Sequence, residues 1–145
     1  MSEPTTRAID TNGVRLHALC WGTEGPLAVL VHGFPDTPWT WDVVGPRLAA
    51  AGYRVVAPYT RGIGPSTDTS PPNYDTDTLG TDILGLIEAL GEDKAVVVGH
   101  DFGAAAAYAA AGLGAERVDR LVTLAIPHPA AIRPTPAKLW GCATS

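Results

Sequence analysis

The sequence has few cysteines and few charged residues, and it has no long hydrophobic run. Charged residues make up 17% of the 145 residues, Cys20 and Cys142 are the two cysteines, and no stretch approaches the roughly 20 apolar residues that a membrane span needs. The cysteines do not have the spacing of a zinc site or a redox pair, so we expect both to be reduced and no metal to be bound. Residues 1–6 have neither the basic start nor the apolar core of a secretion signal. These absences predict a cytoplasmic protein without a membrane partner.

Positive charge and nucleotide-binding motifs are scarce as well. Ten Lys and Arg residues stand against fifteen Asp and Glu residues, which gives a formal net charge of −5. This balance argues against a surface built to neutralise phosphates, so no nucleic acid partner is expected. Gly62 and Gly64 do not complete a dinucleotide-binding fingerprint, because position 67 is Thr67, and the sequence has no phosphate-binding loop. We therefore expect no cofactor.

The residues that are abundant fit one domain rich in turns, since 46% are hydrophobic and the chain has 16 glycines and 13 prolines. Residues 7–18 alternate around Asn12-Gly13, a dipeptide typical of a tight hairpin turn. Further along, apolar runs without polar alternation indicate strands covered on both faces, as in a parallel sheet between helices. These runs are residues 27–31, 53–57, 95–98 and 121–126. The predicted fold class is α/β, with a mostly parallel central sheet and flanking helices.

Two helices are predicted between these strands. The first covers residues 41–51, with Gly52 placed to end it. In the second, Asp77 and Asp82 favour the amino end and Gly91 supplies the stop. Its apolar residues recur at helical spacing and are interpreted as a core-facing stripe: Leu79, Ile83, Leu86, Ile87 and Leu90. Pro, Gly, Ser and Thr dominate residues 58–74, which predicts a long surface loop.

A sharp turn from strand to helix follows the apolar run at residues 95–98. It has the form of a nucleophile elbow, in which a central residue takes a strained backbone conformation and small neighbours avoid collisions. An Asp at this point has a simpler explanation, since Asp also caps the first turn of a helix. The residues of this turn are Gly99, His100, Asp101, Phe102 and Gly103.

A second motif favours the nucleophile elbow over the helix cap. It comes directly after the buried run at residues 27–31, which is where the other half of an oxyanion hole lies in such a sheet. Its residues are His32, Gly33, Phe34, Pro35 and Asp36. The two motifs in this order are a much more specific signal than either of them alone.

At this point the sequence resembles the α/β-hydrolase superfamily, and within it the epoxide hydrolase and haloalkane dehalogenase branch. Trp39 and Trp41, the loop at residues 61–66 and Pro-His-Pro at residues 127–129 extend the match over nearly the whole chain. The resemblance implies a hydrolase of the α/β-hydrolase fold that acts on a small-molecule substrate, an epoxide or a similar electrophile. It implies that Asp101 attacks a substrate carbon to give a covalent alkyl-enzyme ester.

The same resemblance assigns the remaining site residues. The backbone N–H groups of Phe34 and Phe102 are expected to form the oxyanion hole. The expected supporting residues are His32, Gly33, Pro35, Gly99, His100 and Gly103; the two histidines stabilise their turns by hydrogen bonds. Phe102 favours an epoxide hydrolase-like enzyme over a haloalkane dehalogenase-like one, which remains an alternative, because dehalogenases usually carry Trp there to bind the halide. An Asp at position 101 also disfavours an esterase.

The sequence departs from the family pattern in two places. Tyr59 stands where the family usually has Asp, and we interpret it as a loop aromatic that packs over the sheet end. In the family, the catalytic acid, the catalytic His and the cap domain follow the segment matched here. We therefore expect residues 1–145 to be a partial core domain, the amino-terminal half, truncated before the cap. His128 precedes the cap position and is not the expected base.

This departure predicts that the 145-residue chain alone is inactive, since the catalytic His and acid are missing from it. It also leaves the last predicted strand, residues 121–126, as an open sheet edge, which favours self-association or pairing with a partner chain. An alternative to the enzyme therefore stays open: a non-catalytic remnant, or one part of a split protein.

Overall fold

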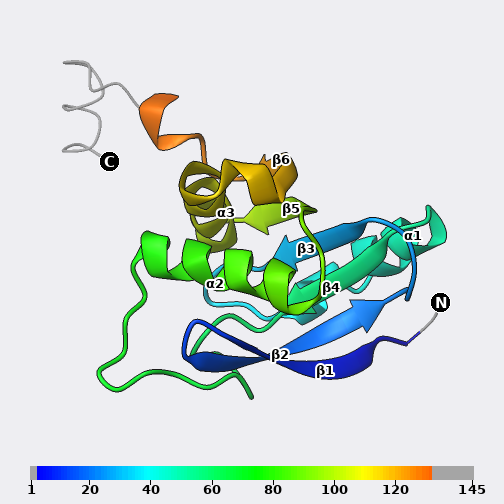
Figure 1. Cartoon of the computed structure of the whole chain (residues 1–145), viewed down its shortest axis with the longest axis horizontal. Helices are drawn as coiled ribbons and strands as arrows, with labels where there is room; N and C mark the ends of the chain where they lie inside the picture. Colours follow the sequence, from blue (N-terminus) through cyan, green and yellow to red (C-terminus); the bar gives the residue numbers. More distant parts are fainter. Residues whose placement is uncertain (1–2, 132–145) are drawn as a thin grey trace.

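The computed structural model describes residues 3–131, which form one six-stranded sheet with helices on both faces (Figure 1). Along the sheet the strands have the order β1-β2-β4-β3-β5-β6. Their bounds are β1 Thr5–Thr11, β2 Val14–Trp21, β3 Leu27–Val31, β4 Arg54–Pro58, β5 Ala95–His100 and β6 Val118–Leu124. The predicted strands are thus all present, within a few residues of their predicted bounds.

The sheet is mostly parallel, as predicted. β3 pairs in parallel with both β4 and β5, and β5 pairs in parallel with β6. The antiparallel part is the amino-terminal hairpin, in which β1 pairs with β2, and β2 in turn pairs with β4. Asn12 and Gly13 form the hairpin turn with φ angles of 48° and 79°, the left-handed region that this dipeptide tolerates.

Helices cover the two faces unequally. α1 (Val44–Ala50) packs on β2 and β4 on one face, and α2 (Thr76–Ala89) packs against α3 (Phe102–Leu113) on the other, as Figure 1 shows. In α2 the predicted stripe is confirmed: four of its five residues are buried and Leu79 packs against the same cluster. The core thus forms between the sheet and the α2–α3 pair, with a smaller cluster under α1.

Two predicted bounds were wrong, and each has a local cause. The first helix is shorter than residues 41–51, because a separate 3-10 turn (Pro38–Trp41) precedes α1. Pro46 lies in the first turn of α1, the part of a helix where its missing N–H is tolerated, so the helix cannot begin much earlier. β6 begins at Val118 and ends at Leu124, since Ala125 has a φ of 73° that no strand accommodates.

At the far side of the sheet β6 is an edge strand within residues 3–131. Val122 and Leu124 on this strand are 45% and 46% exposed, although both side chains are apolar. The predicted open edge is therefore present in the described part of the chain. Cys142 and the expected stop before a cap lie outside the described residues, while Cys20 is a free thiol.

None of the helices within residues 3–131 is both long and apolar enough to cross a membrane.

Candidate active site

The candidate site lies where two loops leave the carboxyl ends of adjacent parallel strands. We call residues 32–36 the β3 loop and residues 99–103 the elbow. Because β3 and β5 pair directly, with Val31 opposite Gly99, the two loops emerge side by side. Ligand sites of open α/β sheets form at this edge. The pairing of the strands brings the β3 loop against Asp101 of the elbow.

Asp101 has the backbone of an elbow and does not cap α3. Its φ and ψ are 58° and −122°, a region that residues with a Cβ rarely adopt, and its own N–H donates to the Leu124 carbonyl at 3.1 Å. Asp101 precedes α3, but its side chain makes no capping hydrogen bond. The simpler interpretation of this Asp as a helix cap was therefore wrong.

Three glycines make the close approach of the loops possible. A Cβ on Gly99 would overlap the Gly103 carbonyl, and a Cβ on Gly103 would overlap the Val31 carbonyl. A Cβ on Gly33 would lie 2.6 Å from the Asp101 Cβ. A side chain at Gly33 or Gly103 would push the elbow away from β3 and its loop, and one at Gly99 would open the turn of the elbow itself, so each position requires glycine on steric grounds.

The Asp101 carboxylate faces backbone N–H groups and forms no ion pair within residues 3–131. The Phe34 N–H donates to Asp101 Oδ2 at 3.3 Å. The backbone N–H groups of Phe102 and then Phe34 lower the pKa of the Asp101 carboxyl below its usual value. The result is an ionised carboxylate that is oriented by neutral donors, a state suited to nucleophilic attack on carbon.

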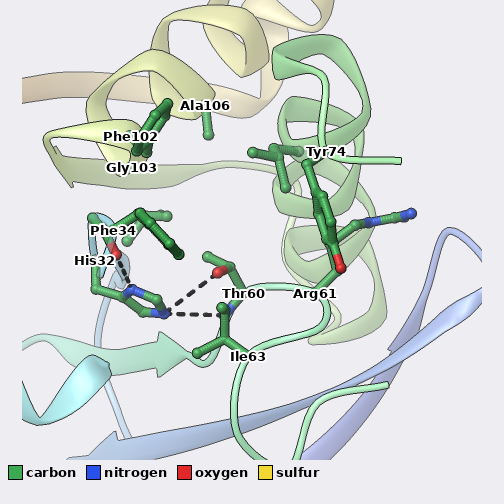
Figure 2. A pocket seen from close by; sticks show the side chains of 12 residues that line it. His32, Phe34, Thr60, Arg61, Ile63, Tyr74, Phe102, Gly103 and Ala106 are labelled. Carbon is green, nitrogen blue, oxygen red and sulfur yellow. Dashed lines mark hydrogen bonds between the residues drawn. The ribbon is translucent and has the colours of Figure 1, made fainter. Parts of the chain in front are cut away.

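Beside the two loops lies a cavity of about 290 Å³ (Figure 2). Phe34 and Phe102 line it with their rings edge to face, 6.1 Å between centroids, and both rings are more than half exposed. The sequence analysis used the Phe102 side chain only to disfavour a dehalogenase and did not predict that either ring lines a cavity. The cavity is also lined by four residues with polar groups, His32, Thr60, Arg61 and Tyr74, and by six without a polar side chain: Val31, Gly33, Ile63, Leu79, Gly103 and Ala106. Tyr74, another residue missed from sequence, turns its hydroxyl away from the two rings and donates it to Asp68.

Of the two histidines expected to support the turns, one has a defined set of hydrogen bonds. His32 is buried, its Nδ1 lies 2.7 Å from the Gly33 carbonyl, and its Nε2 accepts the Thr60 N–H at 3.1 Å. Burial lowers the pKa of this ring. His100 has no recorded side-chain hydrogen bond within residues 3–131, so its supporting role stays a prediction, as does that of Pro35.

A buried ion pair anchors the loop that follows β4. Arg61 Nε and Nη2 donate to Asp82 Oδ2 and Oδ1, both at 2.8 Å, and both side chains are almost fully buried. The prediction that Asp82 favours the amino end of α2 was wrong, because Asp75 caps that helix by accepting the Thr78 N–H. A signal was present in the sequence: position 82 lies on the apolar stripe of α2, where a carboxylate needs a cation.

Two further predicted residues lie outside the cavity. Tyr59 accepts the Trp39 Nε1–H at 3.1 Å, and its ring packs against Gly64 at the end of β4. His128 packs edge to face on Tyr108, 5.0 Å between centroids, and lines a separate cavity of about 240 Å³. The structure therefore does not bring His128 into the cavity beside the elbow. Residues 3–131 also contain no cluster of three His, Cys, Asp or Glu side chains that could hold a metal ion.

Comparisons with known proteins agree with this architecture. A family model described as alpha/beta hydrolase fold matches residues 26–141. Epoxide hydrolase A of Mycobacterium tuberculosis is 43% identical over 129 residues, which are 88% of this chain and 40% of that protein. The AB hydrolase superfamily protein YfhM of Bacillus subtilis is 43% identical over 123 residues, 83% of this chain and 43% of that protein.

Solved structures give the same result. The crystal structure of Epoxide Hydrolase A from Mycobacterium thermoresistibile aligns with a TM-score of 0.84 at 37% identity, over 97% of this chain and 44% of that one. Epoxide hydrolase VrEH1 from Vigna radiata aligns with a TM-score of 0.84 at 30% identity, over 98% of this chain and 46% of that one. The chain spans less than half the length of the relatives it matches.

Proposed function

Because the chain belongs to the α/β-hydrolase family, we propose that it carries the nucleophile and the oxyanion loop of an epoxide hydrolase-like enzyme. The single observation that carries this proposal is the state of Asp101: a carboxylate on a strained turn, in no ion pair of the described residues, held by backbone N–H groups. A structural aspartate at a helix start uses its carboxylate to cap the helix, and Asp101 does not.

In the first proposed step an Asp101 carboxylate oxygen attacks a ring carbon of the epoxide. The new C–O ester bond forms as the ring C–O bond breaks, and the ring oxygen leaves as an alkoxide that takes a proton from water. The product is a hydroxyalkyl ester of Asp101. The carboxylate is ionised at neutral pH, as an ordinary Asp is, and the N–H groups of Phe102 and Phe34 lower its pKa further, so no base has to activate it.

In the second proposed step water attacks the ester carbonyl carbon. The carbonyl oxygen becomes an oxyanion, which the Phe34 and Phe102 N–H groups stabilise; collapse of this intermediate releases a diol and restores the carboxylate. Loss of one such donor typically costs roughly 2.7 to 4 kcal/mol. This step needs a base for water. His32 has both ring nitrogens engaged and His128 lines a different cavity, so we expect the ester in this chain to be long-lived.

The cavity beside the elbow supports a substrate with an apolar substituent. The residues that line it include Phe34, Phe102, Ile63 and Leu79, while Asp101 is not one of the lining residues but stands next to Phe102, which is. An apolar group gains free energy by leaving water for such a site. A haloalkane is a weaker candidate, since the Phe102 ring has no N–H to donate to a leaving halide.

Intact mass spectrometry after incubation with 1,2-epoxybutane tests this proposal. We expect the 145-residue chain to gain the mass of one epoxide, and the Asp101→Asn variant to gain none. Asp119→Asn is the matched control, because Asp119 lies on β6 in a partly exposed pair with Lys94, and it should react like the parent chain. Equal labelling of the parent chain and of Asp101→Asn would contradict the proposal, as would an unreacted parent chain with intact circular dichroism.

The alternative, a non-catalytic chain that pairs with a second copy, has one observation in its favour. β6 has a free edge within the described residues, and it exposes Val122 and Leu124 on one face. Sedimentation velocity distinguishes the two: a defined dimer that Val122→Lys dissociates, together with no label on Asp101, would favour this alternative over the enzyme.

A further inference from the structure

One peptide group of the β3 loop connects Asp101 to a buried histidine. The Gly33–Phe34 peptide directs its N–H to Asp101 Oδ2, 3.3 Å from the nitrogen, and its carbonyl oxygen lies 2.7 Å from His32 Nδ1. A trans peptide is planar, with its N–H and C=O pointing in opposite directions. Whatever fixes the carbonyl therefore fixes the direction of the N–H as well.

The hydrogen bonds of His32 permit one protonation state of the ring. The Thr60 backbone N–H can only donate, so His32 Nε2, at 3.1 Å, must accept and carries no proton. The proton of the neutral ring then sits on Nδ1 and donates to the Gly33 carbonyl, which can only accept. Figure 2 shows the ring between these two contacts, with the Thr60 hydroxyl oxygen, which can donate to the same nitrogen, 3.5 Å from Nε2. A ring protonated on both nitrogens would place a second donor against the Thr60 N–H.

We propose that His32 is a positioning residue that locks the Gly33–Phe34 peptide with its N–H towards Asp101. The proposal rests on the proposed function only for its catalytic meaning, since the contacts themselves do not depend on the reaction. The lock acts through Gly33, to whose carbonyl the Nδ1–H is bonded. His32 itself touches no reacting atom.

A lock is needed here because of the glycine. Position 33 must be glycine, because a Cβ there would collide with the Asp101 Cβ. A glycine, however, has the widest choice of backbone conformations. Rotation of the Gly33–Phe34 peptide would turn its carbonyl oxygen towards the carboxylate and remove the N–H. The oxyanion donor would then be lost without any change in the residues that line the site.

The ion pair in the loop after β4 holds Thr60 in place, and the Thr60 N–H is the group that donates to His32 Nε2. Thr60, which donates to His32 Nε2, is followed directly by Arg61, and the Arg61 guanidinium is bound at two nitrogens by Asp82. Both members of this pair are almost fully buried, so the loop backbone has little freedom to move. The Thr60 N–H thus presents a fixed donor that selects the Nδ1–H tautomer.

Two substitutions separate the two hydrogen bonds of the ring. In His32→Asn the amide NH₂ occupies the place of Nδ1 and can still donate to the Gly33 carbonyl. In His32→Gln the amide oxygen reaches the place of Nε2 and accepts from Thr60, but the Gly33 carbonyl loses its donor. If the lock operates, the pKa of the Asp101 carboxyl rises towards its usual value in His32→Gln and stays at the parent value in His32→Asn.

The test is a ¹³C NMR titration of Asp101 in the parent chain and both variants, with ¹⁵N NMR of the parent His32 ring. His17→Gln, a substitution at a half-buried histidine of β2, is the control and leaves the Asp101 pKa unchanged. An Nε2–H tautomer in the parent chain would overturn the proposal without any variant. So would an Asp101 pKa in a folded His32→Gln that equals the parent value.

The same samples separate this inference from the proposed function. Suppose that the parent chain forms no epoxide adduct but has the Nδ1–H tautomer, and that the Asp101 pKa is raised in His32→Gln. The positioning role of His32 then stands and the proposed function is wrong. If the parent chain forms the adduct but has the Nε2–H tautomer, the proposed function stands and the positioning role of His32 is wrong.

Discussion

Two aspartates of this chain, Asp82 and Asp101, have opposite surroundings. Asp82 is buried on α2 and receives two hydrogen bonds from the Arg61 guanidinium. Asp101 is held by backbone N–H groups, forms no ion pair within residues 3–131 and stands on a strained turn. A carboxylate that a guanidinium neutralises at both oxygens stabilises a loop. A carboxylate that neutral donors hold keeps its charge available for attack on carbon.

The largest expected effect is the loss of stability on removal of the Asp82 carboxylate. Asp82→Ala leaves the Arg61 guanidinium buried without its partner, and removing one member of a buried pair costs about 3–5 kcal/mol. Urea unfolding followed by circular dichroism measures this loss. The control is Asp10→Asn, which breaks the exposed pair with Arg15 and should leave the unfolding midpoint unchanged. Equal midpoints for Asp82→Ala and the parent chain would show that the pair does not stabilise the loop.

The next effect concerns the packing that lets the β3 loop approach the elbow. Gly103→Ala adds a Cβ that overlaps backbone atoms of β3, and overpacking of this kind costs about 1–3 kcal/mol. Gly112→Ala is the matched control in the same helix, since its Cβ meets nothing within 4 Å, and it should stabilise the chain by about 0.4–1 kcal/mol. Thermal unfolding of the two variants should therefore shift in opposite directions. A shift in the same direction would contradict the close packing at the elbow.

A smaller effect tests the strain at Asp101 itself. Its φ of 58° favours glycine, so Asp101→Gly should increase the free energy of unfolding by about 1 kcal/mol, while Asp82→Gly should decrease it. The increase in stability should be accompanied by complete loss of epoxide labelling. A destabilised Asp101→Gly would mean that the turn stores no strain.

The smallest effect is a pH dependence. The folded state lowers the pKa of Asp101, so the unfolded state binds more protons below about pH 4 and stability rises with pH in that window. The contribution of Asp101 is complete above the unfolded pKa and is lost as the pH falls through the folded pKa. Urea unfolding at a series of pH values between about 2 and about 5 measures this contribution. The free energy of unfolding should depend less steeply on pH in Asp101→Asn than in the parent chain. Identical slopes would rule out the shift.

Features that depend on neighbouring residues could be predicted from the sequence. The Asn12-Gly13 turn and the apolar stripe of α2 are local patterns, and the structure confirms both. The order of the two glycine motifs after buried strands was enough to predict that the β3 loop and the elbow meet. That prediction came from the place that the second half of an oxyanion hole takes beside a nucleophile elbow in such a sheet.

Features that depend on distant residues were missed or assigned wrongly. Asp82 was assigned to the amino end of its helix, because its partner Arg61 stands 21 positions earlier in an irregular loop. The Phe34 and Phe102 rings come together only because β3 and β5 are neighbours, and nothing local in either motif places a ring in the cavity wall. The direction of the Gly33–Phe34 peptide likewise depends on Thr60, which comes from another strand end.

Peptide mapping after epoxide labelling tests the central claim most directly, since it compares the two aspartates in one sample. The parent chain is incubated with 1,2-epoxybutane, digested, and analysed by tandem mass spectrometry. The account predicts a hydroxyalkyl ester on Asp101 and an unmodified Asp82. An ester on Asp82, or one spread over exposed carboxylates with Asp101 unmodified, would contradict it.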